Sequence, residues 1–276
     1  MESKNLVSCF SAFFSILDIA LGLTIALRMS FECFFAKFSK PDLSANINNE
    51  FNIIEYNKYR IAITICEDLW YNQPLLTDFG KEKLYTISPV ERLKKLNPDF
   101  LINIAASPFS YTHEEIKKDI LTENARDYGI PVLYLNQVGA NTELIFDGDS
   151  IVINAKGTIV DKLNSFKEDL RTYNIEKIIQ NTETESKFDK LPAITKIHDA
   201  LVLGIKDYFE KSDFKTAILG LSGGIDSAVT LVLASEALGS ANLRVLLLPS
   251  KYSSEHSITD AVKLANNLDV KYDIIK

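Results

Sequence analysis

The sequence is poor in cysteine and has no excess of basic residues. Its 276 residues include only three cysteines, Cys9, Cys33 and Cys66, which are too few and too scattered for a disulfide framework or a zinc site. Lysine and arginine number 30 against 37 acidic residues, giving a net charge of −7. This balance argues against nucleic-acid binding, which needs a basic face. The few cysteines fit a reducing compartment, so we expect a cytoplasmic protein.

One long apolar run, Leu6 to Leu27, lies near the start of the chain. It is long enough to cross a bilayer, but Asp18 in its middle would cost about 2.5–3.5 kcal/mol on insertion. No small-residue cleavage site follows it, so a signal peptide is poorly supported. Two interpretations stay open: the first is a membrane anchor, and the second is a buried helix, a non-native extension or a mistranslated start. We favour the second and do not expect a membrane protein.

The first half of the chain has the pattern of an α/β domain. Short apolar runs rich in β-branched residues predict strands buried on both faces at residues 60–66, 100–105 and 131–136. A helix is predicted over residues 112–128, with Thr112 as its N-cap and Gly129 ending it. Residues 151–160 predict an antiparallel hairpin that turns at Gly157.

The second half alternates strands and helices. The predicted strands are residues 217–221, 243–248 and 270–275, and the predicted helices are residues 192–209, 226–238 and 254–268. Such alternation is typical of a parallel, doubly wound sheet. A polar, acidic stretch without apolar periodicity precedes this half and is interpreted as a linker. We therefore divide the chain into an apolar segment (1–50), a first domain (51–181), a linker (182–189) and a second domain (190–276).

A glycine-containing loop connects the first predicted strand and helix of the second domain. The loop comprises Gly220, Leu221, Ser222, Gly223, Gly224, Ile225, Asp226 and Ser227. Its glycines allow a tight turn and close backbone approach to a ligand, and amides at a helix start attract phosphate. Asp226 would repel a bare phosphate, so its presence indicates a bridging Mg²⁺. The alternative is a tight strand-to-helix turn with a serine cap.

This pattern resembles the loop of the ATP-pyrophosphatase family, which releases pyrophosphate and transfers AMP. It lacks the Lys-Ser/Thr ending of a Walker A loop, which disfavours γ-phosphate transfer. Together with residues 248–254, which follow the next predicted strand, it looks like the amidotransferase-fed NAD synthetases in particular. The resemblance implies that ATP and Mg²⁺ serve to adenylate the carboxylate of deamido-NAD⁺, and that ammonia then displaces AMP.

Cys66 closes the first predicted strand and precedes Glu67 and Asp68. A thiol at a strand end can attack an amide carbonyl once a base or a cation favours the thiolate. Taken alone, a cysteine at this position is more often a core residue. Its neighbours, however, resemble the nucleophile strand of the nitrilase superfamily, which hydrolyses amides or nitriles with a Glu-Lys-Cys triad.

The resemblance continues along the chain at residues 103–109, 135–143 and 146–150, which look like the glutaminase domain of glutamine-dependent NAD synthetases. It covers roughly residues 51–276 and implies a partial nitrilase-like α-β sandwich followed by the start of an ATP-pyrophosphatase domain. By this likeness Ser107 would bind the substrate glutamine close to Cys66. His113 stands where the family prefers lysine or arginine for that contact. The implied partners are glutamine, deamido-NAD⁺ and ATP, and the full-length enzyme is expected to be a homo-oligomer.

Two parts of the family pattern are missing. Only 65 residues precede Cys66, and none of them resembles the motifs of the triad glutamate and lysine. We interpret Glu50, Glu55 and Lys58 as surface residues and expect weak glutamine hydrolysis. Two other functions stay open: another ATP-pyrophosphatase amidotransferase, such as one that makes GMP or asparagine, and a nucleotide-binding protein without catalysis. The Cys66 motif and residues 136–139 count against the first.

Overall fold

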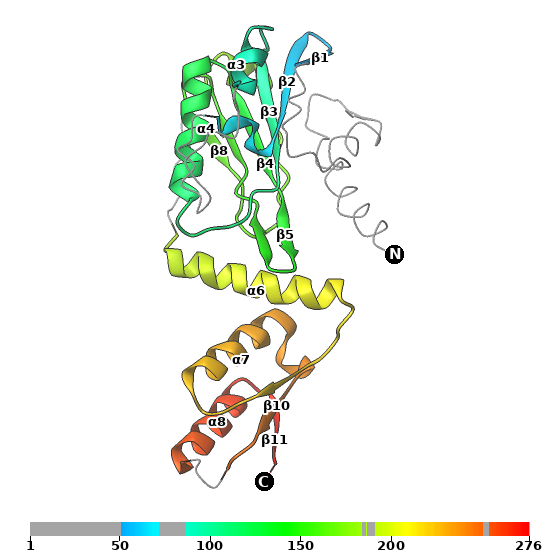
Figure 1. The fold of residues 1–276 in the computed structure, drawn as a ribbon, viewed down its shortest axis with the longest axis vertical. Helices are drawn as coiled ribbons and strands as arrows, with labels where there is room; N and C mark the ends of the chain where they lie inside the picture. Colours follow the sequence, from blue (N-terminus) through cyan, green and yellow to red (C-terminus); the bar gives the residue numbers. More distant parts are fainter. Residues whose placement is uncertain (1–50, 72–86, 184–185, 187–190, 251–253, 276) are drawn as a thin grey trace.

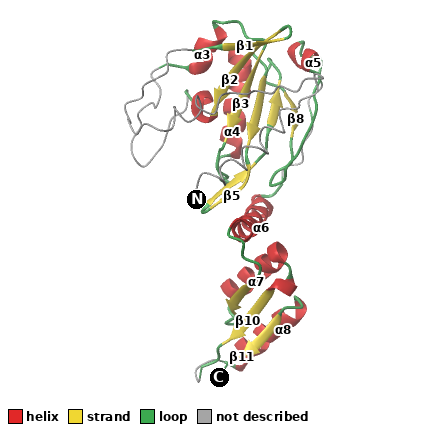
Figure 2. Cartoon of the chain, turned by 90° about the vertical axis from the view of Figure 1, so that its right-hand side faces the viewer, coloured by secondary structure: helices red, strands yellow, loops and turns green. Residues whose placement is uncertain are grey.

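The computed structural model describes residues 51–71, 87–183, 186, 191–250 and 254–275 (Figure 1). The apolar segment at residues 6–27 lies outside these ranges, and so does part of the predicted linker. Two units, each built around a sheet, lie at opposite ends of the described chain, and helix α6 lies between them (Figures 1 and 2). Among the described residues, no helix has both the length and the apolar character needed to cross a membrane.

The first unit is built on a six-stranded mixed sheet. Its strands, in spatial order, are β1 (Ile53–Tyr56), β2 (Tyr59–Ile65), β3 (Phe100–Ala105), β4 (Val132–Asn136), β7 (Ile151–Ile153) and β8 (Ile159–Lys162). The three predicted buried strands are confirmed as its parallel centre, β2 to β4. The predicted hairpin is β7–β8, and it joins the same sheet by pairing antiparallel with β4.

Apolar side chains on both faces of this sheet form its core. On one face, Leu101 and Val132 pack in a cluster with Leu121 and Ala125 of helix α4 (Glu114–Tyr128) and with residues of helix α3 (Pro89–Lys94). On the other face, the short helix α5 (Ile175–Ile179) contributes to a second cluster. Strands buried on both faces explain why their sequences lack an apolar–polar alternation.

The predicted N-cap of α4 is wrong by one residue. Thr112 is not its N-cap, because the helix begins at Glu114 with His113 at the capping position. The Thr112 hydroxyl instead lies 3.0 Å from the Ser110 hydroxyl, within a turn that the His113 amide closes on the Ser110 carbonyl. The predicted end is confirmed, since Gly129 adopts the left-handed conformation with φ 64°, which glycine adopts without steric cost.

A second hairpin projects from this unit toward α6 (Figure 1). It consists of β5 (Val138–Asn141) and β6 (Leu144–Asp147), which pair with each other in a two-stranded antiparallel sheet. These strands were not predicted from the sequence, although most of their residues lie in the motifs at 135–143 and 146–150. Helix α6 (Ala193–Lys211) packs against both of them and against α7. Sequence analysis assigned α6 to the second domain, and in the structure the helix contacts both units.

The second unit is a three-stranded parallel sheet, as predicted. Its strands, in spatial order, are β11 (Lys271–Ile274), β10 (Leu243–Leu247) and β9 (Ala217–Gly220). Helices α7 (Ile225–Leu238) and α8 (Glu255–Asn267) follow β9 and β10. Leu231 and Ala261 of these helices are buried with Val245 in one core cluster. Ile218 is 68% exposed, so in the described part of the chain the two helices leave apolar sheet surface uncovered.

Candidate functional sites

Cys66 lies at the carboxyl end of β2, as the sequence predicts, and there begins a sharp turn into a short helix. It is the first residue of the 3-10 helix η1 (Cys66–Leu69) and has φ 47°. A non-glycine residue in this left-handed region costs about 1–3 kcal/mol and is held there by its surroundings. The Asp68 carboxylate contributes by accepting a 2.8 Å hydrogen bond from the Ile65 amide. The turn leaves the Cys66 side chain half-buried at the edge of the sheet.

A buried asparagine supports this turn from the neighbouring strand. The Asn103 side-chain amide donates to the Thr64 hydroxyl at 2.9 Å and to the Cys66 carbonyl at 3.3 Å. Thr64, Asn103 and Tyr134 are register partners across β2, β3 and β4, so their side chains lie on one face. Sequence analysis did not assign Asn103 or Tyr134 to the site. Asn103 could have been found from the sequence, because it is a polar residue in the middle of an otherwise apolar strand.

Ser107 follows the end of β3, next to the Cys66 turn. The backbone amide of Ala106, the residue before Ser107, lies close enough to the Cys66 thiol to lower its pKa. Asn136, at the end of β4, holds Ser107 by both backbone groups: its Oδ1 accepts from the Ser107 amide at 2.8 Å and its Nδ2 donates to the Ser107 carbonyl at 3.2 Å.

The environment of Cys66 favours the neutral thiol. Burial raises the pKa of Cys66, the Ala106 amide opposes this shift, and the charges of Glu67 and Asp68 add to it. Within the described ranges, no lysine or carboxylate hydrogen-bonds the thiol. A protonated thiol is a weak nucleophile, so the described residues alone do not activate it.

His113 lies six positions beyond Ser107, at the start of α4. Its side chain is exposed, and among the described residues nothing hydrogen-bonds its ring. Its backbone carbonyl accepts the Lys117 amide at 2.9 Å as the first bond of the helix. The structure therefore brings Ser107 to Cys66 and leaves His113 on the outside of the same segment.

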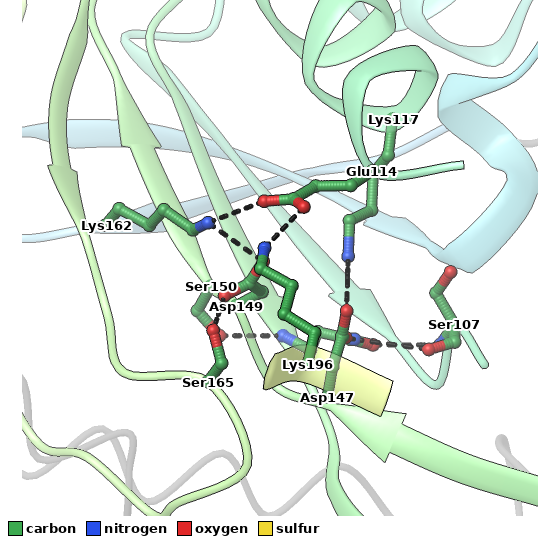
Figure 3. A network of polar contacts seen from close by, with 10 residues as sticks. Ser107, Glu114, Lys117, Asp147, Asp149, Ser150, Lys162, Ser165 and Lys196 are labelled. Atoms are coloured by element: carbon green, nitrogen blue, oxygen red, sulfur yellow. Dashed lines mark hydrogen bonds and ion pairs between the residues drawn. The ribbon is translucent and has the colours of Figure 1, made fainter. Parts of the chain in front are cut away.

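A buried ion pair lies behind Ser107 (Figure 3). Lys117 of α4 reaches Asp147 of β6 at 3.3 Å, and both side chains are less than one tenth exposed. Asp147 also accepts a 2.9 Å hydrogen bond from Asn136. Burial raises the pKa of Asp147, and the positive charge of Lys117 opposes this rise. The pair thus connects α4 and β6 to the asparagine that holds Ser107.

A second network of two lysines and two carboxylates lies next to it (Figure 3). Lys162 lies 3.0 Å from both Glu114 and Asp149, and Lys196 of α6 hydrogen-bonds Glu114. Asp149, only 2% exposed, also accepts from the Ser165 hydroxyl. Burial alone would raise the pKa of Glu114, but hydrogen bonds from Lys196 and Lys162 outweigh it and lower this pKa to about 2. Sequence analysis did not predict either network.

The glycine loop lies between β9 and α7, at the carboxyl edge of the parallel sheet. Gly223 has φ 82°, and a Cβ added to it would lie 2.3 Å from the Ser257 carbonyl oxygen at the start of α8. Only glycine fits this position. The Ser222 hydroxyl accepts the Gly224 amide at 3.2 Å and lies 3.1 Å from the Ser227 hydroxyl. Serine side chains thus shape the turn at the point where α7 begins.

A cavity opens beside this loop, where ligands bind in open α/β sheets. Its volume is about 260 Å³, and it is lined by Gly220, Leu221, Ser222, Leu246, Leu247, Leu248, Pro249, Ser257 and Ile258. Asp226 is exposed in the first turn of α7. The described residues contain no group of three His, Cys, Asp or Glu side chains that could hold a metal. A cation at Asp226 would therefore need phosphate oxygens to complete its coordination.

The chain is similar to proteins of known function. Residues 197–276 match the family model "NAD synthase". The glutamine-dependent NAD(+) synthetase of Synechocystis is 39% identical over 222 residues, which cover 80% of this chain and 39% of that protein. The chain is a relative of the glutamine-dependent NAD(+) synthetases. A match over four fifths of the chain must include parts of both units.

Solved structures agree with this relationship. The glutamine-dependent NAD⁺ synthetase of Acinetobacter baumannii, solved with ADP, superposes with a TM-score of 0.70 at 33% identity and covers 82% of this chain. The synthetase of Cytophaga hutchinsonii, at 18% identity and a TM-score of 0.63, has the same fold. The chain spans about two fifths of the length of the curated relatives it matches. The expected α/β fold class is thus confirmed.

Proposed function

We propose that the protein makes NAD⁺ from deamido-NAD⁺, with glutamine as amide donor and ATP as activating substrate. The similarity to glutamine-dependent NAD(+) synthetases across both units carries this proposal. In it, the Cys66 unit releases ammonia from glutamine and the unit with the glycine loop consumes it. The same similarity counts against other ATP-pyrophosphatase amidotransferases.

On the nucleotide side, the amides of Gly223 and Gly224 would bind phosphate oxygens of ATP at the start of α7. Asp226 would hold Mg²⁺, which neutralises charge on the phosphates. The carboxylate of deamido-NAD⁺ attacks the α-phosphorus, and pyrophosphate leaves. Ammonia then attacks the carbonyl carbon of the acyl-adenylate, and AMP leaves. The exposed position of Asp226 and the adjacent cavity support this assignment.

On the glutamine side, the Cys66 thiolate would attack the side-chain amide carbon, and ammonia would leave from the tetrahedral intermediate. Water then hydrolyses the thioester to glutamate. Ser107 would contact the glutamine, supported by its place beside the thiol. His113 would contact the substrate only if its exposed ring turned inward. The raised pKa of Cys66 supports slow hydrolysis by the described residues.

That raised pKa also favours a second candidate, a chain that binds nucleotide without hydrolysing glutamine. One experiment separates the two. The protein is incubated with Mg²⁺-ATP, deamido-NAD⁺ and either amide-¹⁵N glutamine or ammonium chloride, and NAD⁺ is measured by mass spectrometry. We expect ¹⁵N-NAD⁺ from glutamine, formed more slowly than NAD⁺ from ammonium. NAD⁺ from ammonium alone would favour the second candidate, and no NAD⁺ from either donor would contradict the proposed reaction.

We further propose that the protein acts in the cytoplasm and as a homo-oligomer. Its proposed substrates are soluble metabolites. Ile225, Val229 and Val232 form an apolar row on α7 that is 75%, 49% and 39% exposed. Apolar surface of this kind is typical of subunit contacts. Light scattering after size exclusion tests this proposal, and a monomer at all accessible concentrations would contradict it.

A further inference from the structure

Helix α6 is fixed to the Ser107 segment at two separate places. The segment from Ser107 to Glu114 leads from the end of β3 into α4. One attachment runs through Lys196 near the start of α6, and the other runs through Asp207 near its end. Each attachment reaches the segment through polar contacts between residues that are far apart in the sequence.

The first attachment is direct. Lys196, whose side chain is only 8% exposed, donates a hydrogen bond to Glu114 (Figure 3). Glu114 begins α4, and Lys162 holds its other carboxylate oxygen at 3.0 Å. Lys196 also lies 4.0 Å from the buried Asp149. Lys196 lies near two carboxylates at once, so removing its charge leaves Lys162 as their one cation among the described residues.

The second attachment runs through the β5–β6 hairpin. The Asp207 carboxylate accepts the Ala140 amide at 2.7 Å, and Lys211 donates to the Ala140 carbonyl. The fit is close, since a Cβ added to Gly139 would lie 2.9 Å from Asp207 and one added to Gly204 would lie 3.1 Å from Ile145. Helix α6 thus holds β5 by a backbone amide and a backbone carbonyl.

The hairpin in turn holds the Ser107 segment. The Phe109 amide donates to the Ile145 carbonyl at 2.6 Å, and Pro108 forms an isolated bridge with Phe146. Asp147, the last residue of β6, binds the Asn136 side chain that holds both backbone groups of Ser107. Contacts therefore lead continuously from Asp207 to Ser107.

The opposite side of α6 faces the nucleotide unit. The helix packs on α7, which begins at the glycine loop, and His198 of α6 lies 2.9 Å from Glu236 of α7. We propose that Lys196 and Asp207 are positioning residues of the cysteine site, through which α6 sets the place of the Ser107–Glu114 segment. The inference rests on the proposed function for the claim that this segment binds glutamine.

The first test measures the segment itself, without any ligand. Hydrogen exchange is compared in the full chain for Lys196→Met, Asp207→Ala and the control Lys206→Met. Lys206 is exposed on the same helix, and among the described residues its one ion pair is with Glu210, at 4.0 Å. We expect the amides of Ser107 and Phe109 to exchange about tenfold faster in both site variants than in the control, because local opening costs less there.

The second test measures how well a glutamine analogue binds next to Cys66. A glutamine analogue with a reactive diazoketone is compared with iodoacetamide, both followed by mass spectrometry of the Cys66 peptide. For Lys196→Met we expect the analogue concentration that half-saturates labelling of Cys66 to rise about tenfold. This change lies within the range that small misplacements of a site cause. The rate at saturation and the iodoacetamide rate should stay within about twofold. A residue that only stabilises the fold would not change the affinity for the analogue while leaving both labelling rates unchanged. Lys196→Arg, which keeps the charge, should restore most of the affinity.

The outcomes separate the two proposals. Unchanged exchange at Ser107 and Phe109 in both site variants would overturn the positioning role, whatever the analogue does. Equal changes with the analogue and with iodoacetamide would also overturn it. If the analogue fails to label wild-type Cys66 selectively, the proposed glutamine site fails, and hydrogen exchange still decides whether α6 positions the segment. If Lys196→Met does not fold, Asp207→Ala and Lys196→Arg carry both tests.

Discussion

Alanine at Gly223 should destabilise the nucleotide unit through two effects that other glycines separate. Gly223 combines φ 82° with a close approach to Ser257, whose carbonyl oxygen, Cα and carbonyl carbon would lie 2.3, 2.7 and 2.8 Å from an added Cβ. Gly239 has φ 80° but nothing within 4 Å of an added Cβ, and Gly220 has neither feature. The three positions form a matched series within one unit.

The magnitudes follow from this geometry. A left-handed conformation costs a residue with a Cβ about 1–2 kcal/mol. Forcing an atom into a packed backbone costs about 1–3 kcal/mol more. We therefore expect the free energy of unfolding to fall by about 1–2 kcal/mol for Gly239→Ala and about 2–5 kcal/mol for Gly223→Ala. Gly220→Ala should change it little, or raise it by about 0.4–1 kcal/mol through the unfolded state.

Urea denaturation followed by circular dichroism measures all three variants, with the change in unfolding slope as a check on two-state behaviour. Gly223→Ala should also lose binding of Mg²⁺-ATP, because the turn can accept the methyl group only if α8 moves away. If Gly223→Ala is no less stable than Gly239→Ala, the close approach of the loop to Ser257 is wrong, and the geometry derived for the phosphate loop is wrong with it.

Three further predictions concern single side chains. Asp226→Asn should weaken binding of Mg²⁺-ATP at least about tenfold and binding of metal-free ATP little, because the carboxylate acts through the metal; calorimetry with and without EDTA measures both, and equal losses would contradict the metal assignment. Alkylation of the Cys66 peptide should rise with pH up to a midpoint above about 8.5, the usual value for cysteine, because burial raises the pKa of this thiol; a midpoint at or below neutrality would reveal an activating cation. The pKa of Glu114 is lowered from 4.5 to about 2, so its contribution to stability is complete above pH 4.5 and is lost as the pH falls toward 2. Urea midpoints across this range should fall less steeply in Glu114→Gln, and parallel curves would contradict the pairing.

Secondary structure was largely predictable because its signals are local. Buried strands appeared as short apolar runs, the helix over residues 112–128 from its end signals, and the later helices from their alternation with strands. Most predicted boundaries agree with the structure within about two residues. Thr112 failed as an N-cap because its hydroxyl bonds Ser110 inside a preceding turn. That turn depends on how the segment packs against β6, which local sequence does not encode.

More of the glycine-loop site than of the Cys66 site could be predicted from the sequence. The glycine loop is contiguous, so its place between a strand and a helix follows from local sequence. The surroundings of Cys66 are not contiguous. Glu114 and Lys196 are 82 residues apart, and Lys117 and Asp147 are 30 apart. No periodicity connects such residues, and only the folded chain shows that their charges compensate one another.

The polar attachment of α6 explains how one position of this helix is selected. An apolar helix face can slide along its groove by a turn, about 5.4 Å, and still bury most of its surface. Lys196 and Asp207 are 11 positions apart, about three turns, so both lie on the same side of the helix. A slide of one turn would withdraw Lys196 from Glu114 and Asp207 from the Ala140 amide together, so that the buried Lys196 would lose its carboxylates and the amide its acceptor. The two contacts therefore fix the position of α6 along its own axis. They do so where the helix packs on the β5–β6 hairpin, which contacts the Ser107 segment.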